Sequence, residues 1–264
     1  MIKKIFLEID RKDINMKKPS RVLIRLFDIS FSFFLLTALF IPLIILILIK
    51  LIVDGRPLCF NSKRIGQNSN LFTVYKFRTM VNNRAVITTY LDSINSFGFE
   101  KIPRDAPIYT KMGCFFEKYQ IVELLQLFNV LQGNMSLIGY RPLPELRFKQ
   151  LEQEVGKEKL AQRHNVLPGI TGLSQIVGKS KLSNSERVEI EIYYNKFLKN
   201  NGQSKILRYN ILILLETLIQ ILLRRDFLMI FKKEKVLNSI FIDDKKIINE
   251  IVKASFTNAR RYSA

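Results

Sequence analysis

Residues Ile29 to Ile49 read ISFSFFLLTALFIPLIILILI, a run of roughly 21 positions without a charged side chain. A helix of that length, at about 1.5 Å per residue, matches the ~30 Å hydrocarbon core of a bilayer. The run begins too late and extends too far for a signal peptide, and no small-residue cleavage site follows it. It therefore predicts a membrane segment.

Pro42 interrupts this segment and predicts a kink, because proline lacks a backbone N–H and clashes with the preceding helical turn. Basic residues flank both sides, whereas a simple spanning helix concentrates them on one side. The flanking residues are Lys17, Lys18, Arg21 and Arg25 before the segment and Lys50, Arg56, Lys63 and Arg64 after it. This pattern favours a re-entrant helix with both ends on one membrane face, and it leaves a kinked spanning helix as the alternative.

A second apolar stretch, Ile206 to Leu223, carries Glu216 and Gln220 on one helical face. It is too interrupted for a comfortable membrane span, so we expect a helix that lies on the membrane or packs on the domain. The stretches between the two apolar segments predict a strand at Leu71–Phe77 and helices at Phe115–Leu131, Leu151–Arg163 and Glu186–Leu198.

The composition indicates a folded protein that binds anions. Of 264 residues, 48% are hydrophobic and 25% are charged, which excludes global disorder. Lys and Arg number 42 against 23 Asp and Glu, a formal charge of +19 that points to nucleic acid, an anionic membrane or a phosphorylated substrate. The single histidine, His164, excludes a site with several histidine ligands. Cys59 and Cys114 form no spaced framework and indicate a reduced, cytosolic setting.

Cations on short turns are suited to binding a diphosphate, because they bring fixed charge and backbone N–H donors to its oxygens. Several lie beside glycines, which allow close backbone approach. The candidates are Arg64 in KRIG, Lys76 and Arg78 in KFRT, Arg141 in GYRP and Lys179 after PGITGLSQIVG.

Five stretches, taken in order, resemble the bacterial sugar transferase family, the monotopic polyprenyl-phosphate phosphoglycosyl transferases. They are RLFDI (Arg25–Ile29), RIG (Arg64–Gly66), YKFRTM (Tyr75–Met80), ELLQLFNVLQGNMSLIGYRP (Glu123–Pro142) and LPGITGLSQIVGK (Leu167–Lys179). The resemblance implies transfer of a sugar-1-phosphate from a UDP-sugar to undecaprenyl phosphate, at the cytoplasmic face of the bacterial inner membrane. It also implies Mg²⁺ and an Asp-Glu pair, whose aspartate attacks the β-phosphorus and forms a covalent intermediate.

The implied fold is an α-rich α+β one, with a re-entrant membrane helix, a cytoplasmic transferase domain and an interfacial C-terminal helix. On this basis we divide the chain into a basic segment 1–20, a membrane helix 21–57 broken at Pro42, a transferase-like domain 58–198, an interfacial helix 199–231 and a basic tail 232–264. No motif specifies the sugar or an oligomeric state.

The sequence departs from the family at the reacting atom. The family's Asp-Glu-Leu-Pro-Gln reads Val122-Glu123-Leu124-Leu125-Gln126, so the nucleophilic aspartate is replaced by valine. An isopropyl group neither attacks phosphorus nor binds Mg²⁺. Further departures put Glu117 where the family has arginine, Ala106-Pro107-Ile108 where it has Asp-Pro-Arg, and Glu191 where it has aspartate.

Three interpretations follow. In the first, the protein is an active transferase in which Glu123 takes over the attack, although adjacent helical residues point about 100° apart. In the second, it is a catalytically inactive family member that keeps binding or regulatory functions at the membrane. In the third, Val122 is incidental in a degenerate gene product. A nucleic-acid binder is disfavoured, because the sequence has no recognition-helix or aromatic-basic motif. The expected catalytic residue is Glu123, and the expected substrate-binding residues are Arg64, Lys76, Arg78, Arg141, Gln175 and Lys179.

Overall fold

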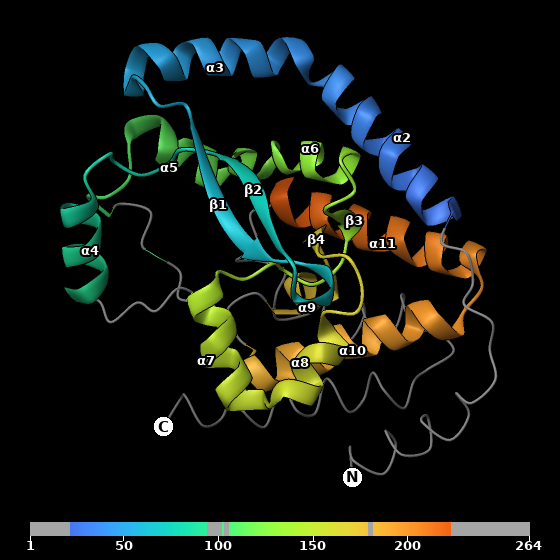
Figure 1. Cartoon of the computed structure of the whole chain (residues 1–264). Helices are drawn as coiled ribbons and strands as arrows, with labels where there is room; N and C mark the ends of the chain where they lie inside the picture. The colour runs from blue at the N-terminus through green and yellow to red at the C-terminus, as the bar shows by residue number, and fades with distance from the viewer. Residues whose placement is uncertain (1–21, 94–101, 103–105, 179–181, 223–264) are drawn as a thin grey trace.

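The computed structural model describes residues 22–93, 102, 106–178 and 182–222, arranged as Figure 1 shows. The predicted segment 1–20, the tail 232–264, Lys179 and the end of the predicted helix 199–231 lie outside these residues. The elements in chain order are α2 (Val22–Ala38), α3 (Phe40–Asp54), β1 (Cys59–Ile65), η1 (Gln67–Ser69), β2 (Leu71–Phe77), α4 (Arg84–Ser93), α5 (Lys111–Lys118), η2 (Ile121–Glu123), α6 (Gln126–Leu131), β3 (Ser136–Ile138), α7 (Glu145–Val155), α8 (Lys157–Arg163), β4 (Gly169–Thr171), α9 (Leu173–Gly178), α10 (Asn184–Asn200) and α11 (Gln203–Leu222).

Helices α2 and α3 form an apolar arm along one edge of the molecule, with a bend of 60° between them (Figure 1). Among the described helices, none alone is long and apolar enough to cross a membrane, whereas this bent pair together meets both measures. The bend falls at Leu39, ahead of the predicted break at Pro42. Pro42 cannot donate to the carbonyl of Ala38 four positions earlier, so the helix opens one turn before the proline.

Two polar side chains attach α2 to the rest of the fold. Arg25 Nη2 donates to the carbonyls of Val130 (2.6 Å) and Leu131 (3.1 Å), at the end of α6. Asp28 is buried, and its Oδ1 accepts from the backbone N–H of Leu137 in β3 at 3.2 Å. A cation at a helix C-terminus satisfies carbonyls that have no helical partner. The arm is therefore held by backbone groups as well as by apolar packing.

A buried ion pair attaches the other end of the arm. The fully buried Lys50 Nζ lies 2.6 Å from the carboxylate of Asp54 and 5.3 Å from the ring centre of Phe116. The same carboxylate accepts from the hydroxyl of Thr110 at 2.7 Å and from the N–H of Met112 at 3.1 Å. Since helix N-termini carry N–H groups without helical partners, Asp54 ties the end of α3 to the start of α5.

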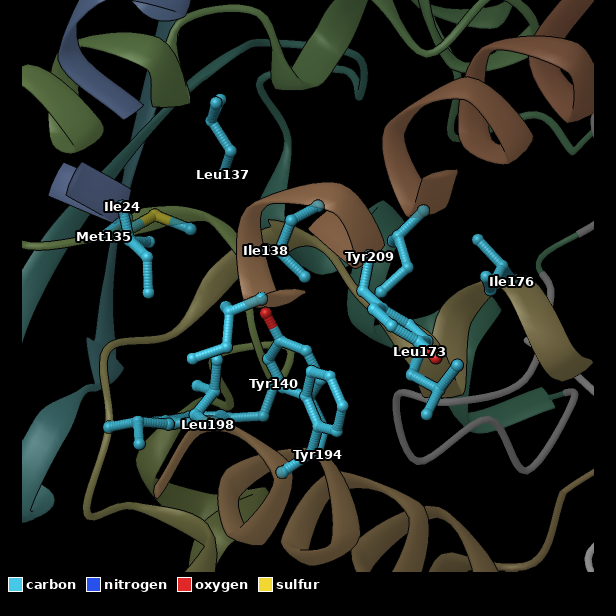
Figure 2. Packing of buried hydrophobic residues seen from close by; sticks show 14 of the residues in the cluster. Ile24, Met135, Leu137, Ile138, Tyr140, Leu173, Ile176, Tyr194, Leu198 and Tyr209 are labelled. Carbon is cyan, nitrogen blue, oxygen red and sulfur yellow. The ribbon is translucent and has the colours of Figure 1, made fainter. Parts of the chain in front are cut away.

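The core lies around two small sheets. Strands β1 and β2 form an antiparallel hairpin whose register runs from Cys59 opposite Phe77 to Ile65 opposite Leu71. Strands β3 and β4 pair in parallel. Figure 2 shows Ile138 and Tyr140, from β3 and the turn after it, in one packed cluster with Tyr194 and Leu198 of α10 and Tyr209 of α11. This cluster fixes the backbone of the β3 segment, which leads directly into the candidate site.

Several sequence-based predictions of secondary structure can be compared with these elements. The strand predicted at Leu71–Phe77 is confirmed as β2. The single helix predicted at Phe115–Leu131 is wrong, because Gln120 adopts a left-handed conformation (φ 58°) and separates α5 from η2 and α6. The helix predicted at Leu151–Arg163 is also broken, at Gly156, whose φ of 88° ends α7 and starts α8.

Helix α11 packs on the domain, which is one of the two arrangements left open by the sequence. Its buried residues Ile206 and Ile213 belong to the main core cluster, while Leu215 and Leu218 are exposed. The side-chain amide of Gln220 donates to the carbonyl of Ile176 in α9 at 3.0 Å. The contact of the exposed face with a membrane stays a prediction.

Candidate functional site

A pocket of about 120 Å³ lies where the β1–β2 hairpin, the turn after β3 and the start of α7 meet. Figure 1 shows α7 beginning beside this hairpin. Four of the lining side chains are cationic. The lining residues are Arg64, Val74, Lys76, Gln126, Arg141, Pro142, Leu143, Pro144 and Arg147. The structure thus gathers three of the predicted substrate-binding residues (Arg64, Lys76 and Arg141) around one cavity.

The register of the β1–β2 hairpin explains why Arg64 and Lys76 reach the same cavity. Arg64 is opposite Phe72, and side chains two apart on β2 share a face, so Phe72, Val74 and Lys76 lie on the face of Arg64. Lys63, one residue earlier, points to the opposite face and is exposed. Strand alternation therefore separates a pocket cation from a surface cation on adjacent residues.

Arg141 is positioned by two turns whose backbones touch. A Cβ atom on Gly139 would lie 2.6 Å from the carbonyl oxygen of Leu167, and one on Gly172 would lie 2.0 Å from the carbonyl oxygen of Gly139. Only glycine allows such an approach. These glycines therefore allow the GYRP and PGITG turns to pack against each other, and the predicted approach of backbone to a ligand stays a prediction.

Glu123 and Arg141 form a close ion pair at this pocket. Glu123 ends the short η2 turn, and its Oε1 accepts from Arg141 Nη2 at 2.6 Å. The Glu123 carboxylate is the largest influence on the Arg141 guanidinium and raises its pKa. The carboxylate expected to act in catalysis is thus bound to the arginine expected to hold the substrate.

The cations of the pocket repel one another. Burial and then the positive charge of Arg141 lower the pKa of Lys76 to about 8. The same two causes lower the pKa of Arg64 to about 10. Burial is the larger cause of both shifts, and repulsion between like charges adds to it, so an anion in the pocket would favour the charged forms of these side chains.

Val122, at the position where the resemblance leads us to expect an aspartate, lies in a separate apolar cluster. Its side chain is 5% exposed and packs with Phe77 (2%) and Phe116 (0%). Leu46 of α3 and Leu125 pack against the same cluster. Position 122 is therefore part of the contact between the arm and the domain.

A buried network of Arg163, Glu191 and Ser174 holds the backbone of Arg141. Arg163 is fully buried, forms an ion pair with Glu191, and donates from Nη2 to the backbone carbonyl of Arg141 at 2.9 Å. The hydroxyl of Ser174 donates to Glu191 at 2.8 Å. His164 Nε2 lies 2.9 Å from Arg163 Nη1, and Nδ1 lies 2.7 Å from the carbonyl of Leu160.

The neutral form of His164 fits this network, since Nδ1 donates to the carbonyl while Nε2 accepts from the guanidinium. Burial and then the charge of Arg163 lower the pKa of His164 to about 3. His164 is the C-cap residue of α8. The structure gives it the structural role of orienting Arg163.

Two further predicted substrate-binding residues, Arg78 and Gln175, do not line the pocket. Arg78 is buried, and its guanidinium donates to the backbone carbonyls of Pro57 (2.6 Å), Asp54 (2.7 Å) and Gly55 (3.1 Å), so it holds the chain after α3. Gln175 is buried in α9 and does not line the pocket. Lys179 lies outside the described residues.

Arg147 is a pocket residue that the sequence did not single out. It lies in the first turn of α7, where its Nη1 also donates to Gln150 at 2.8 Å. No glycine or turn motif adjoins it, and its neighbours give an ordinary charged helix. Its six-residue distance from Arg141, across the turn that starts α7, is the signal that could have identified it.

The donor atoms at this site are poor ligands for Mg²⁺, which prefers several oxygens in octahedral geometry. In the part of the chain that the structure describes, no three His, Cys, Asp or Glu side chains group closely enough to hold a metal. Glu123 is paired with Arg141, and Glu117 accepts from the hydroxyl of Thr79 at 3.2 Å. The residues present do not fit the Mg²⁺ site that the resemblance implies.

Comparison with known proteins gives a match to one family. The sequence model described as "Bacterial sugar transferase" matches residues 19–224. This range includes the bent arm, the pocket and all of α11.

Individual relatives cover a similar part of the chain. The Undecaprenyl-phosphate galactose phosphotransferase of Salmonella typhimurium is 36% identical over 185 residues, 68% of this chain and 38% of that protein. The Uncharacterized sugar transferase EpsL of Bacillus subtilis is 36% identical over 173 residues, 66% of this chain and 77% of that protein. The Undecaprenyl-phosphate glucose phosphotransferase of Komagataeibacter xylinus is 41% identical over 157 residues, 58% and 27%. The chain thus spans less than half the length of two of these relatives.

Proposed function

The chain belongs to the bacterial sugar transferase family, and from this premise we propose that it binds the diphosphate of a UDP-sugar in the cationic pocket without performing the family's covalent step. In this proposal it acts as a membrane-bound binding or regulatory partner in polysaccharide synthesis. Its ligands are the two substrates of the family reaction, a UDP-sugar and undecaprenyl phosphate. The name of the Salmonella relative, Undecaprenyl-phosphate galactose phosphotransferase, supports undecaprenyl phosphate as one of these ligands.

One observation supports the proposal: three cationic side chains line a pocket, while position 122, where the resemblance leads us to expect the nucleophilic aspartate, holds a valine. Arg64, Lys76 and Arg141 remain gathered at the pocket. Val122 packs its isopropyl group between Phe77 and Phe116 and offers no atom that can attack phosphorus. A site with these cations and a valine at position 122 can attract a diphosphate, but it has no nucleophile at that position to form a phosphosugar intermediate.

We further propose that the protein lies at the cytoplasmic face of the inner membrane. The bent apolar pair α2–α3 supports a re-entrant arm, and the exposed apolar residues of α11, including Leu215 and Leu218, support an interfacial helix. The formal charge of +19 favours an anionic lipid surface.

The second candidate function is sugar-1-phosphate transfer with Glu123 as the nucleophile. The presence of a carboxylate within 2.6 Å of a pocket arginine favours it. In this reaction a Glu123 oxygen bonds to the β-phosphorus, the bond to the bridging oxygen breaks and UMP leaves. The phosphate oxygen of undecaprenyl phosphate then displaces the carboxylate. The ion pair to Arg141 opposes this role, because it withdraws electron density from the attacking oxygen.

The test measures UDP-sugar binding and UMP release by the full chain in lipid nanodiscs, with a panel of UDP-sugars and undecaprenyl phosphate. Glu123→Gln is compared with Glu145→Gln, which removes an exposed glutamate of α7 instead. Binding without UMP release supports the binding function. UMP release that disappears in Glu123→Gln and persists in Glu145→Gln supports the transferase. Absence of binding to every UDP-sugar contradicts both.

A further inference from the structure

We infer that the pocket binds its diphosphate ligand without a divalent cation, because the pocket's own cationic side chains supply the positive charge. This inference rests on the proposed function and deepens it by defining the ionic form of the ligand. It is opposite to what the family resemblance implies for Mg²⁺.

The pocket already holds an excess of positive charge. Arg64, Lys76, Arg141 and Arg147 line it. Two carboxylates act on these cations: Glu123, which is paired with Arg141, and Glu117, which does not line the pocket. A diphosphate carries several negative charges, which this excess of cations can match. Arginine also binds phosphate oxygens through two parallel N–H donors, a geometry that a metal ion does not need to organise.

A metal ion would compete with Arg141 for Glu123. To bind Mg²⁺, Glu123 would have to give up its 2.6 Å contact with Arg141, and the bound Mg²⁺ would be repelled by the cations that line the pocket. At the neighbouring position 122, where the resemblance leads us to expect a second carboxylate, the chain has a valine that is 5% exposed. The second nearby carboxylate, Glu117, accepts a hydrogen bond from Thr79. Within the described residues, no three His, Cys, Asp or Glu side chains form a group that could hold a metal ion.

Mg²⁺ bound to a nucleoside diphosphate neutralises part of its charge and occupies phosphate oxygens that the arginines would contact. Burial and neighbouring cations disfavour the charged forms of the pocket side chains. The fully charged anion therefore stabilises these charged forms most. The uncomplexed diphosphate is thus the expected ligand, and added Mg²⁺ should leave binding unchanged or weaken it.

The experiment is titration calorimetry of the native full chain in nanodiscs with UDP, once in EDTA and once with excess Mg²⁺. Agreement of the two Kd values within about threefold, or weaker binding with Mg²⁺, is the expected result. Binding that requires Mg²⁺, or tightens about tenfold or more with it, overturns this inference and leaves the proposed function standing. No binding under either condition overturns the proposed function itself.

Matched variants locate the binding in this pocket. Arg147→Gln is compared with Lys149→Gln, since Lys149 lies on the same helix with its side chain 65% exposed. Arg64→Gln is likewise compared with Lys63→Gln on the opposite face of β1. Each pocket variant should weaken UDP binding in EDTA about tenfold, the scale of a lost charge-assisted hydrogen bond, and each control should not. Equal Kd values for a pocket variant and its control overturn the assignment.

Discussion

The substitution Val122→Asp would restore the residue type of the family's nucleophile, yet we expect it to destabilise the protein. Val122 is 5% exposed, and Phe77 and Phe116 beside it are 2% and 0% exposed. An aspartate there would place a carboxyl group in an apolar cluster that also joins α3 to the domain. Such a group is costly whether it ionises or stays protonated.

The magnitude follows from the linkage between ionisation and folding. An aspartate in the unfolded chain has a pKa of about 3.9, and full burial raises it by about 3–5 units. Keeping the carboxyl protonated in the folded state at pH 7 then costs about 4 kcal/mol, at about 1.36 kcal/mol for each pH unit above 3.9. Loss of the buried valine adds about 1–2 kcal/mol. The sum approaches the whole stability of a typical domain, about 5–15 kcal/mol.

The sign of the pH dependence gives the decisive measurement. Because the folded-state pKa is raised, the cost is small near pH 4 and grows as pH rises toward the folded pKa. Thermal unfolding of Val122→Asp and of the matched, non-titrating Val122→Asn should be recorded at about pH 5 and about pH 8. The Tm deficit relative to the native protein should grow with pH for aspartate only. An aspartate variant with native Tm at about pH 8 would refute the burial argument.

Three further predictions concern the pocket and its support. Glu123→Gln should tighten UDP binding about threefold to tenfold in calorimetry, because Arg141 loses its ion pair and becomes available to phosphate; weaker binding would contradict this. UDP affinity should fall as pH rises through about 8, the pKa of Lys76, because only the ammonium form attracts phosphate, and Lys76→Arg should remove the fall. The charged groups that act on this amine are Arg141, Glu123, Arg64 and Glu117. Arg163→Met should lower the free energy of unfolding by about 3–5 kcal/mol by leaving Glu191 buried without its cation, and the double variant with Glu191→Leu should recover part of that loss in denaturant titrations.

Features set by local sequence were predictable. The β-branched and aromatic run Leu71–Phe77 forms β2, because alternation along a strand needs no distant partner. The apolar arm was predictable because a long uncharged run is also a local feature of the sequence. Its bend lies about one turn before Pro42, because proline cannot donate a hydrogen bond to the carbonyl of residue 38. Three of the candidate cations do line one pocket.

Features set by tertiary contacts were not predictable. Arg78 and Arg141 both follow a strand in a short motif, but only the fold sends one guanidinium to the carbonyls after α3 and the other to Glu123. The break at Gln120 has no glycine or proline to announce it, and it requires a left-handed residue that the surrounding packing stabilises. Nothing in the local sequence distinguishes Arg147 from other charged helical residues, because only the tertiary position of the start of α7 brings it to the pocket.

The attachment of α2 has a consequence for how the chain is made. Arg25 meets Val130, which lies 105 residues later, and Asp28 meets Leu137, which lies 109 residues later. At about 5–20 residues per second, a ribosome adds that length in roughly 5–20 seconds. For that interval the arm exists as an apolar helix without the strand that will accept it. In the membrane-bound state that we propose, lipid would cover the apolar arm during this interval, so the bilayer would assist folding before it hosts the function.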